Sequence, residues 1–479
     1  FKKPKIYTND KVIEYVEHFK YLGVTLDSKL NWNEHIERQT RKAKATIFMG
    51  RKMIGKDWGI SPVTAKWLYT TTVRPILAYG AMVWASCLER TKIITTLRKV
   101  QRMACLMMTR AMPSTPTAGM ETLMGLVQID CYMKKEALLA SIRLKASGQW
   151  KYREGETILE NAHARLAEKW GRSIRESNLP QDKLRIKVKL KAEYTTRIQK
   201  RDEIMKEDTK PMPKDKETIS CFTDGSKTEQ GTGAGFSIMG GTTTKQESTY
   251  LGEYTTVYQA EIIAIAEASI ALIQDNTRNK EINFFIDNQS AISSLGSYIT
   301  RNNTTLECKK LLNKLANLGN IITLNWVPGH EGHMGNEVAD WLAKRGVDQP
   351  THGPGPWVPA SKCLVKESIN NWCDVLSEEK WRSRTDCRQT KILLPSTQHA
   401  WRNKIMNLGK VQINKLTQIV TGHANLKRHK FLMKLEEDPL CECGEEEETS
   451  IDVLTECPKF ALKRIHYLGK FKIKPENVN

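Results

Sequence analysis

Residues 219–226 read ISCFTDGS, an apolar run that ends at an acid followed by a glycine. Such a run predicts a strand, and a glycine in the turn after it lets the backbone approach a ligand closely. Three more acids stand at or near the ends of separate predicted elements: Glu261 in YQAE, Asp287 in FFIDNQ and Asp340 in GNEVADW. Together with Asp224 they make a quartet that a folded domain is expected to bring together.

The segments around these acids alternate between strand and helix patterns. Residues 258–272 are apolar almost all round, as in a helix packed against a sheet, and Glu261 lies near the start of this helix. Residues 282–286 stop at Asp287, which is typical of a buried strand whose C-terminal end faces solvent, where open α/β sheets build their sites. The other predicted elements are strands at 219–223, 232–238, 249–252 and 324–327, a glycine-rich loop at 328–335 and a helix from about 336.

Four grouped carboxylates suit hard divalent cations, because Mg²⁺ and Mn²⁺ prefer oxygen ligands. Two such ions would serve in-line displacement at a phosphodiester, one activating the attacking water and the other stabilising the leaving oxygen. Any single Asp or Glu is more often a solvated surface residue. Four of them in these contexts favour a nuclease metal site.

Residues 218–346 resemble ribonuclease H of the retroelement and cellular type 1 family. The motifs that carry the resemblance are TDGS, the AE pair, the strand-end acid before NQS, and WVPGHEGHMGNEVADWLAK at 326–344. The resemblance implies a mixed sheet with flanking helices and cleavage of the RNA strand of RNA–DNA hybrids. It also implies two Mg²⁺ ions, with Mn²⁺ as a substitute, held by Asp224, Glu261, Asp287 and Asp340.

The same resemblance implies supporting roles around the acids. His330 matches the family's mobile-loop histidine, expected to deprotonate water or help product leave, although His333 has a similar claim from the residues alone. A ribonuclease must sense the 2′-hydroxyl, and the resemblance supports that role for Gly225, Ser226 and Asn288. Asn288 also fits a plain turn residue.

Charge is unevenly distributed along this chain of 479 residues, which is long enough for about three domains. The formal net charge is +20, yet residues 218–346 hold 10 Lys and Arg against 13 Asp and Glu, a net charge of −3. The flanking regions therefore carry the excess positive charge, which serves either to attract phosphates or to solvate helices. The strongest basic run, KLRIKVKLK at 183–191, alternates charge with apolar residues as in a strand with one basic face. It lies in a polar stretch, 171–217, that also reads as a basic linker, so a nucleic-acid contact and a linker both remain open.

Residues 1–170 are mostly helical by pattern. Their segments FKYLGVTLDSKLNW (19–32) and VRPILAYGAMVW (73–84) resemble the region after the catalytic palm in jockey-like non-LTR retrotransposon reverse transcriptases. The resemblance implies a thumb and a connection to ribonuclease H, and a plain helical domain is the alternative. In that family the catalytic palm carries an aromatic-x-Asp-Asp motif, and this chain has no Asp-Asp pair. The upstream reverse transcriptase domains are therefore expected to be missing, and no polymerase activity is expected from this chain alone.

A Gly-Pro-rich linker at 347–360 precedes a helical C-terminal region, 361–479, that contains Cys441, Cys443 and Cys457. This spacing resembles the zinc-binding tail of the same retroelements, with Asp452 at the position where the family has histidine. Cys and His dominate structural zinc sites, so a degenerate tail without Zn²⁺ is the alternative. His423 or His429 could replace the missing ligand.

The eight other cysteines show no paired spacing, which suits a reducing intracellular compartment, in the nucleus or the cytoplasm. No run approaches the length of a membrane span, so no membrane partner is expected. The favoured function is ribonuclease H activity on RNA–DNA hybrids within a retrotransposon reverse transcriptase. The alternative is a catalytically lapsed remnant that still binds nucleic acid.

Overall fold

The computed structural model describes residues 4, 6–8, 11–55, 58–146, 170, 179–198, 218–240, 244–329, 334–349, 358–398 and 402–474. The chain divides into two compact units. One unit comprises Phe1–Ser141, Glu156–Trp170 and Ile369–Asn479, and the other comprises Ile142–Gly155 and Gly171–Ser368.

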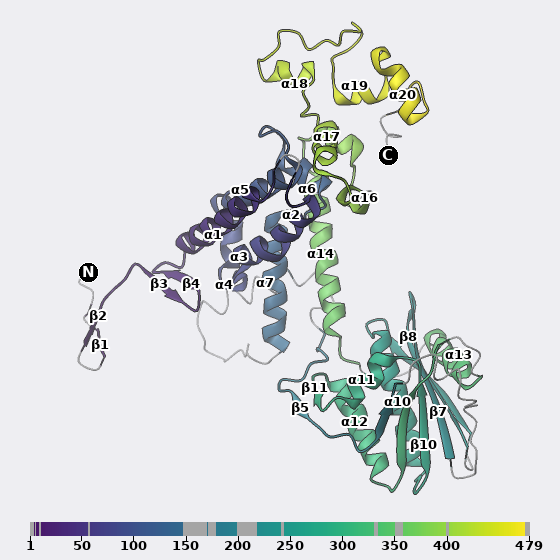
Figure 1. Cartoon of the computed structure of the whole chain (residues 1–479). Coiled ribbons are helices and arrows are strands. Elements are labelled where there is room, and N and C mark those ends of the chain that lie inside the picture. The colour runs from purple at the N-terminus through teal and green to yellow at the C-terminus, as the bar shows by residue number, and fades with distance from the viewer. Residues whose placement is uncertain are drawn as a thin grey trace. The chain divides into compact units, whose positions relative to one another are not determined.

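The second unit is built on a six-stranded mixed sheet (Figure 1), with the strand order β6-β12-β10-β7-β8-β9. Strands β7, β8 and β9 form an antiparallel meander, whereas β10, β12 and β6 run parallel to β7. This confirms the predicted mixed sheet. The strands are β6 (Thr195–Arg197), β7 (Thr218–Thr228), β8 (Gly231–Met239), β9 (Lys245–Gly252), β10 (Glu281–Ile286) and β12 (Ile321–Trp326).

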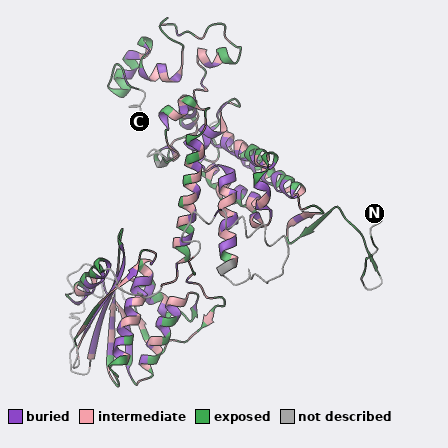
Figure 2. Cartoon of the chain, turned by 180° about the vertical axis from the view of Figure 1, so that it is seen from behind, coloured by how far each residue is buried: buried purple, intermediate pink, exposed green. Residues whose placement is uncertain are grey.

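Helices cover both faces of this sheet, because successive side chains along its strands point to opposite faces and both sets include buried residues. Cys221, Phe284 and Leu324 point into a core that they share with α10 (Val257–Gln274), α11 (Gln289–Gly296) and α12 (Asn303–Ala316). Phe222 points the other way and meets Gly335 at the start of α13 (Met334–Asp348). Figure 2 shows the buried positions running through the strands between these helices. The predicted ribonuclease H-like architecture is thus present.

Two glycines of β8 let α13 approach the sheet closely. A Cβ atom on Gly233 would lie 2.2 Å from the carbonyl oxygen of Ala343, and one on Gly235 would lie 2.3 Å from the amide nitrogen of the same residue. Ala234 between them faces α10 instead. The GTGAG pattern of β8 therefore sets the position of α13 and of the acid that it carries.

The apolar helix α10 is long and apolar enough, by length and composition alone, to cross a membrane. It packs on β7, β8 and α12, and 56% of its most apolar window is buried inside the domain. Its hydropathy is explained by this packing.

Residues 179–198 belong to the second unit, although they fall in the stretch that the sequence pattern assigns to a basic linker. β5 (Val188–Lys189) pairs with β11 (Ile299–Thr300), and β6 extends the main sheet. The sheet therefore begins before residue 218. Of the strand predicted at 183–191, only Val188–Lys189 has strand pairing, and Ile186 is 79% exposed instead of facing inward.

The first unit is mainly helical, as its sequence pattern predicts, with small hairpins at its N-terminus. The long helices α1 (Asn33–Lys52) and α5 (Thr91–Thr109) pack together, and α17 (Lys410–Thr421) packs against α5 and α6 (Thr117–Leu123). Its strands are β1 (Ile6–Thr8), β2 (Lys11–Ile13), β3 (His18–Tyr21) and β4 (Val24–Asp27). Its other helices are α2 (Pro62–Leu68), η1 (Tyr69–Val73), α3 (Arg74–Ala78), α4 (Ala81–Trp84), η2 (Ala85–Glu89), α7 (Ile129–Ala146, to Ser141), α14 (Lys362–Arg382, from Ile369), α15 (Arg388–Leu393), α16 (Arg402–Met406), α18 (Lys427–Leu432), α19 (Ser450–Thr455), η4 (Pro458–Phe460) and α20 (Ala461–Leu468).

Candidate active site and cysteine cluster

Three of the four predicted acids converge at one edge of the sheet. β7 and β10 run parallel with Thr223 opposite Ile286, so Asp224 and Asp287 follow paired residues on neighbouring strands. Glu261 comes from the first turns of α10, which packs on β7. Carboxylate oxygens of Asp224, Glu261 and Asp287 all lie within 4.8 Å of one another.

Gly225 is what allows Glu261 to come this close. A Cβ atom at position 225 would lie 2.7 Å from the amide nitrogen of Glu261 and 2.8 Å from the side chain of Ala260. The motif TDGS therefore supplies an acid and, directly after it, the space into which the start of α10 fits. This packing role is separate from the substrate contact that the sequence suggests for Gly225.

Asp340 lies on α13 and is not part of the group of three. Its Oδ2 accepts a hydrogen bond from Lys344 Nζ at 2.6 Å, an i,i+4 pair on the helix surface. The charge of Asp340 nevertheless reaches the group, because it helps to raise the pKa of Asp224. The fourth acid is thus near the others but paired with a lysine.

Burial and mutual repulsion both disfavour the charged forms of these acids. Burial, with the charges of Asp287 and Asp340, raises the pKa of Asp224 to about 7. Burial, with the charges of Asp224 and Asp287, raises the pKa of Glu261 well above its ordinary value. Without a cation, Asp224 and Glu261 therefore hold a proton more tightly than ordinary carboxyl groups do.

The donor set fits a hard divalent cation. Glu261 is 2% exposed, and its Oε2 has no hydrogen-bond partner in the described part of the structure. An orphaned buried carboxylate oxygen is costly unless something satisfies it. Oxygen ligands gathered around it are what Mg²⁺ or Mn²⁺ prefers.

Asn288 directly follows Asp287, and Ser226 stands two residues after Asp224. Asn288 caps α11 through a bond from the Ala291 amide to its Oδ1, 3.1 Å, and its side chain also hydrogen-bonds to Glu261, which favours the charged form of that acid. Asn288 therefore acts as a helix cap and also contacts Glu261, whereas its predicted contact with substrate stays a prediction. Ser226 follows Gly225 in β7, opposite Gly233. His330 and its competitor His333 lie outside the described residues.

Two supporting residues were not singled out from the sequence. Trp326 ends β12 and donates its indole Nε1–H to the backbone oxygen of Asp287 at 2.9 Å. Gly329 approaches the same acid, since a Cβ atom there would lie 3.0 Å from Asp287 Oδ2. Both belong to the WVPG segment, and its tryptophan and glycine are the sequence features from which these two roles could have been predicted.

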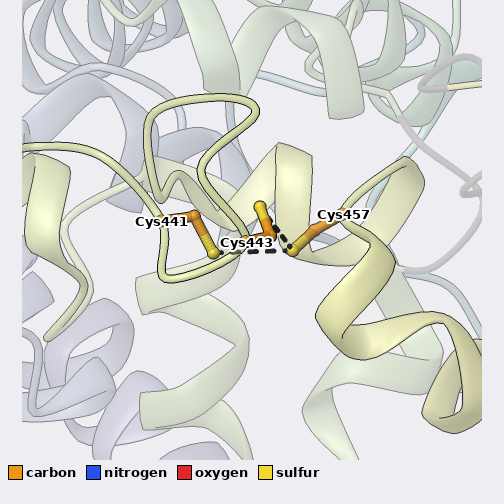
Figure 3. A group of neighbouring side chains, drawn as sticks. All are labelled: Cys441, Cys443 and Cys457. Atoms are coloured by element: carbon orange, nitrogen blue, oxygen red, sulfur yellow. Dashed lines mark hydrogen bonds between the residues drawn. The ribbon is translucent and has the colours of Figure 1, made fainter.

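The three cysteines of the C-terminal region also come together (Figure 3). Cys457 Sγ lies 3.5 Å from Cys441 Sγ and 3.7 Å from Cys443 Sγ. Asp452, on α19, is 6% exposed, and its carboxylate interacts with Cys457 while its Oδ2 has no hydrogen-bond partner among the described residues. The three sulfurs form a group of metal-ligating atoms, and Asp452 contacts one of them without belonging to that group.

The two histidines that could have replaced the missing ligand are engaged elsewhere. His423 Nδ1 and His429 Nε2 each lie 3.3 Å from the hydroxyl of Ser114, and their rings contact each other. Neither belongs to the group formed by the three cysteines.

Comparisons with known proteins agree with this geometry. The family model described as RNase H matches residues 216–348. The chain is 26% identical over 134 residues to a Pol polyprotein from the type-1 retrotransposable element R1 3 of Nasonia vitripennis, which covers 26% of this chain and 35% of that protein. It is 26% identical over 211 residues to an R1 Pol polyprotein of Popillia japonica, covering 43% of this chain and 78% of that one.

A short stretch of 34 residues is 56% identical to a ribonuclease H of Alcanivorax borkumensis and covers 7% of this chain and 22% of that protein. Among solved structures, ribonuclease H1 of Halobacterium salinarum is similar at 20% identity and a TM-score of 0.23, covering 27% of this chain and 98% of that one. The chain spans about a third or less of the first two curated relatives that it matches. Residues 216–348 thus form a ribonuclease H domain, in a chain that is distantly homologous to the Pol polyproteins of R1-type non-LTR retrotransposons.

Proposed function

We propose that this chain is a metal-dependent endonuclease that hydrolyses the RNA strand of RNA–DNA hybrids. The observation that carries the proposal is the cluster of Asp224, Glu261 and Asp287 within 4.8 Å, at the edge of a ribonuclease H sheet. The unpartnered Glu261 oxygen and the raised pKa of Asp224 both mark a site that a cation would satisfy.

Asp224, Glu261, Asp287 and Asp340 are the residues that would hold two Mg²⁺ ions, or Mn²⁺ in their place. When bound, such ions activate the attacking water and stabilise the leaving oxygen. Asn288 holds Glu261 in position, and Lys344 keeps Asp340 at the rim of the site by its 2.6 Å bond. His330 would move a proton from water or assist product release.

Selectivity for RNA would come from groups beside Asp224 and Asp287. Gly225 and Ser226 offer backbone and hydroxyl groups, and Asn288 offers an amide, for the 2′-hydroxyl that distinguishes RNA from DNA. In its biological setting the activity would remove template RNA after first-strand synthesis, inside the cell, in the nucleus or cytoplasm. Polymerisation is not proposed for this chain, and neither is a membrane partner.

A labelled RNA–DNA hybrid incubated with the full chain and Mg²⁺ tests the proposal. We expect D287N to cleave about 100-fold more slowly or worse, a loss of about 2.7 kcal/mol in transition-state stabilisation. D275N, which changes an exposed acid directly after the end of α10, is the matched control and should cleave at the original rate. If the unsubstituted chain cuts no faster than D287N, the alternative of a lapsed nucleic-acid-binding remnant takes over. Equal cleavage of double-stranded DNA would contradict the selectivity.

We also propose that Cys441, Cys443 and Cys457 bind Zn²⁺, with Asp452 replacing the usual histidine. The support is the short sulfur separations together with the orphaned Oδ2 of Asp452. Elemental analysis of the purified full chain should give about one zinc per chain and less than half of that for C457S, because metal and local fold are coupled. D452H should retain zinc, whereas D452A should lose it more readily to a chelator. If the purified chain contains no zinc and all three thiols react with a thiol reagent, the proposal fails and the tail is a degenerate one that does not bind Zn²⁺.

A further inference from the structure

A basic segment, residues 183–191, lies on the surface of the ribonuclease H unit without acidic partners. We call this segment the basic strap. It holds five Lys and Arg and no acid, and four of the cations are exposed: Arg185, Lys187, Lys189 and Lys191. None of them forms an ion pair with a carboxylate in the described part of the chain. Their charge is therefore available to a partner.

The start of the basic strap is fixed to the first turns of α10 and α12. Asp182 is buried, and its carboxylate accepts hydrogen bonds from the amide of Thr304 at 3.0 Å and from the side chain of Gln259 at 3.1 Å. Gln259 stands two residues before Glu261 on α10. The basic strap thus begins next to the helical turn that carries a candidate metal ligand.

The far end of the basic strap is fixed as firmly. Lys309, on α12, is fully buried and donates to the backbone oxygens of Leu190 at 3.1 Å and Ser297 at 2.5 Å. Asn313, one turn later, donates to the backbone oxygen of Lys191 at 2.8 Å and accepts from the amide of Glu193 at 2.9 Å. Such anchors hold the backbone in one place, which distinguishes the basic strap from a solvated linker.

The chain then returns toward the site as β6. This strand runs parallel to β12, with Arg197 opposite Asn325, so its C-terminal end lies at the sheet edge that carries Asp224 and Asp287. Three strand spacings separate β6 from β7, or about 14 Å. At about 3.4 Å per nucleotide along one strand, the distance between the ends of β6 and β7 spans about four nucleotides.

We propose that the basic strap binds the phosphate backbone of the RNA–DNA hybrid on one side of the cleavage site. This inference rests on the proposed function. The acids are expected to engage only the scissile phosphate, and residues 218–346 carry a net charge of −3, so the domain core offers little general attraction for a polyanion. Phosphate contacts supply affinity and position a nucleic acid, and cations on a fixed backbone lose less entropy on binding than cations on a free one.

The test compares two triple variants of the full chain. R185Q/K187Q/K189Q neutralises the basic strap. K245Q/R278Q/K280Q removes the same charge at the strand ends away from the acids, because Arg278 and Lys280 precede β10 and Lys245 begins β9, and both strands run parallel to β7. Affinity for a short hybrid is measured by fluorescence anisotropy over a series of salt concentrations, with both triples in a D287N background so that no cleavage intervenes.

We expect the strap variant to bind the hybrid about tenfold more weakly at about 0.15 M salt and to lower the slope of log K against log salt by about 2 to 3, since each lost phosphate contact contributes about 0.9. The control variant should match D287N. Equal losses in the two variants, or no loss in either, would overturn the inference. Cleavage of the hybrid by the unsubstituted chain is measured separately. If that chain cleaves but the strap variant binds as well as the control, only this inference fails. If the strap variant binds more weakly but the unsubstituted chain does not cleave, only the proposed catalysis fails.

Discussion

At the scale of single residues, Asp224 and Glu261 link the site to pH. An acid whose pKa is raised in the folded state binds more protons folded than unfolded, between its ordinary pKa and the raised one. For Asp224 this window runs from 3.8 to about 7. Deprotonation across it charges a buried cluster and destabilises the fold, so this contribution makes stability fall as pH rises through the window and level off above it.

We therefore predict that the ribonuclease H unit loses thermal stability between about pH 4 and pH 7 without Mg²⁺, and that added Mg²⁺ restores more stability at the higher pH. The reason is that the cation replaces the protons held by the cluster. Thermal denaturation of the full chain at several pH values, with and without Mg²⁺, measures this. D224N is the control, since it should flatten the pH dependence. A stabilisation by Mg²⁺ that is independent of pH would contradict the prediction.

Gly225 gives a second prediction at this scale. G225A would drive a methyl group against the Glu261 amide, 2.7 Å away, and neither backbone can retreat easily. Overpacking of this kind costs about 1–3 kcal/mol, so both the melting temperature and hybrid cleavage should fall. S226A, at the next position, should keep the melting temperature. Loss of cleavage in G225A with full stability would indicate that Gly225 acts through substrate and not through packing.

At the scale of elements, the sequence predicted the strands and helices that carry their own signal. The apolar runs before Asp224 and Asp287 became β7 and β10, and the apolar helix around Glu261 became α10. β5 and β6 have two and three residues and no such signal. Their positions depend on distant partners such as Lys309 and Asn313, which no local pattern reveals. The same holds for the space that Gly233 and Gly235 leave for α13, because it depends on a helix a hundred residues away.

Lys309 offers the test of how this upstream segment is held. K309M keeps most of the side-chain volume but removes the charged donor of the Leu190 and Ser297 backbone oxygens, and hydrogen bonds to charged groups contribute about 1.5–3 kcal/mol. We predict faster tryptic cleavage after Arg185, Lys187 and Lys189, followed by mass spectrometry. K310M is the matched control, because Lys310 is exposed and paired with Glu307. Equal cleavage rates in the two variants would show that the segment is held by other contacts.

At the scale of the whole chain, the N-terminal and C-terminal helical regions fold into one unit although the ribonuclease H domain separates them in sequence. α17 packs against α5 and α6, and a Cβ atom on Gly119 of α6 would lie 3.1 Å from the side chains of Thr390 and Thr421. The ribonuclease H domain is therefore an insertion between two halves of a helical unit. Periodicity predicted helices on both sides but gives no sign that they share a core.

An ion pair between Asp130 on α7 and Lys380 on α14 joins these two halves. Asp130 is 3% exposed, and although burial acts to raise its pKa, Lys380 and Arg98 outweigh burial and hold that pKa below its ordinary value. K380M would remove the nearest cation of a buried carboxylate but leave Arg98 3.6 Å from it, so we expect a cost of about 1–3 kcal/mol, below the cost of a fully unpaired buried charge. We predict that K380M unfolds the helical unit at lower urea concentration while the Mg²⁺-dependent melting of the ribonuclease H unit is unchanged. R382Q, on the same helix, removes an exposed pair with Glu378 and should cost about 1 kcal/mol or less. Matching urea midpoints for K380M and R382Q would mean that apolar packing alone joins the two halves, whereas a shared shift in both units would mean that they unfold together.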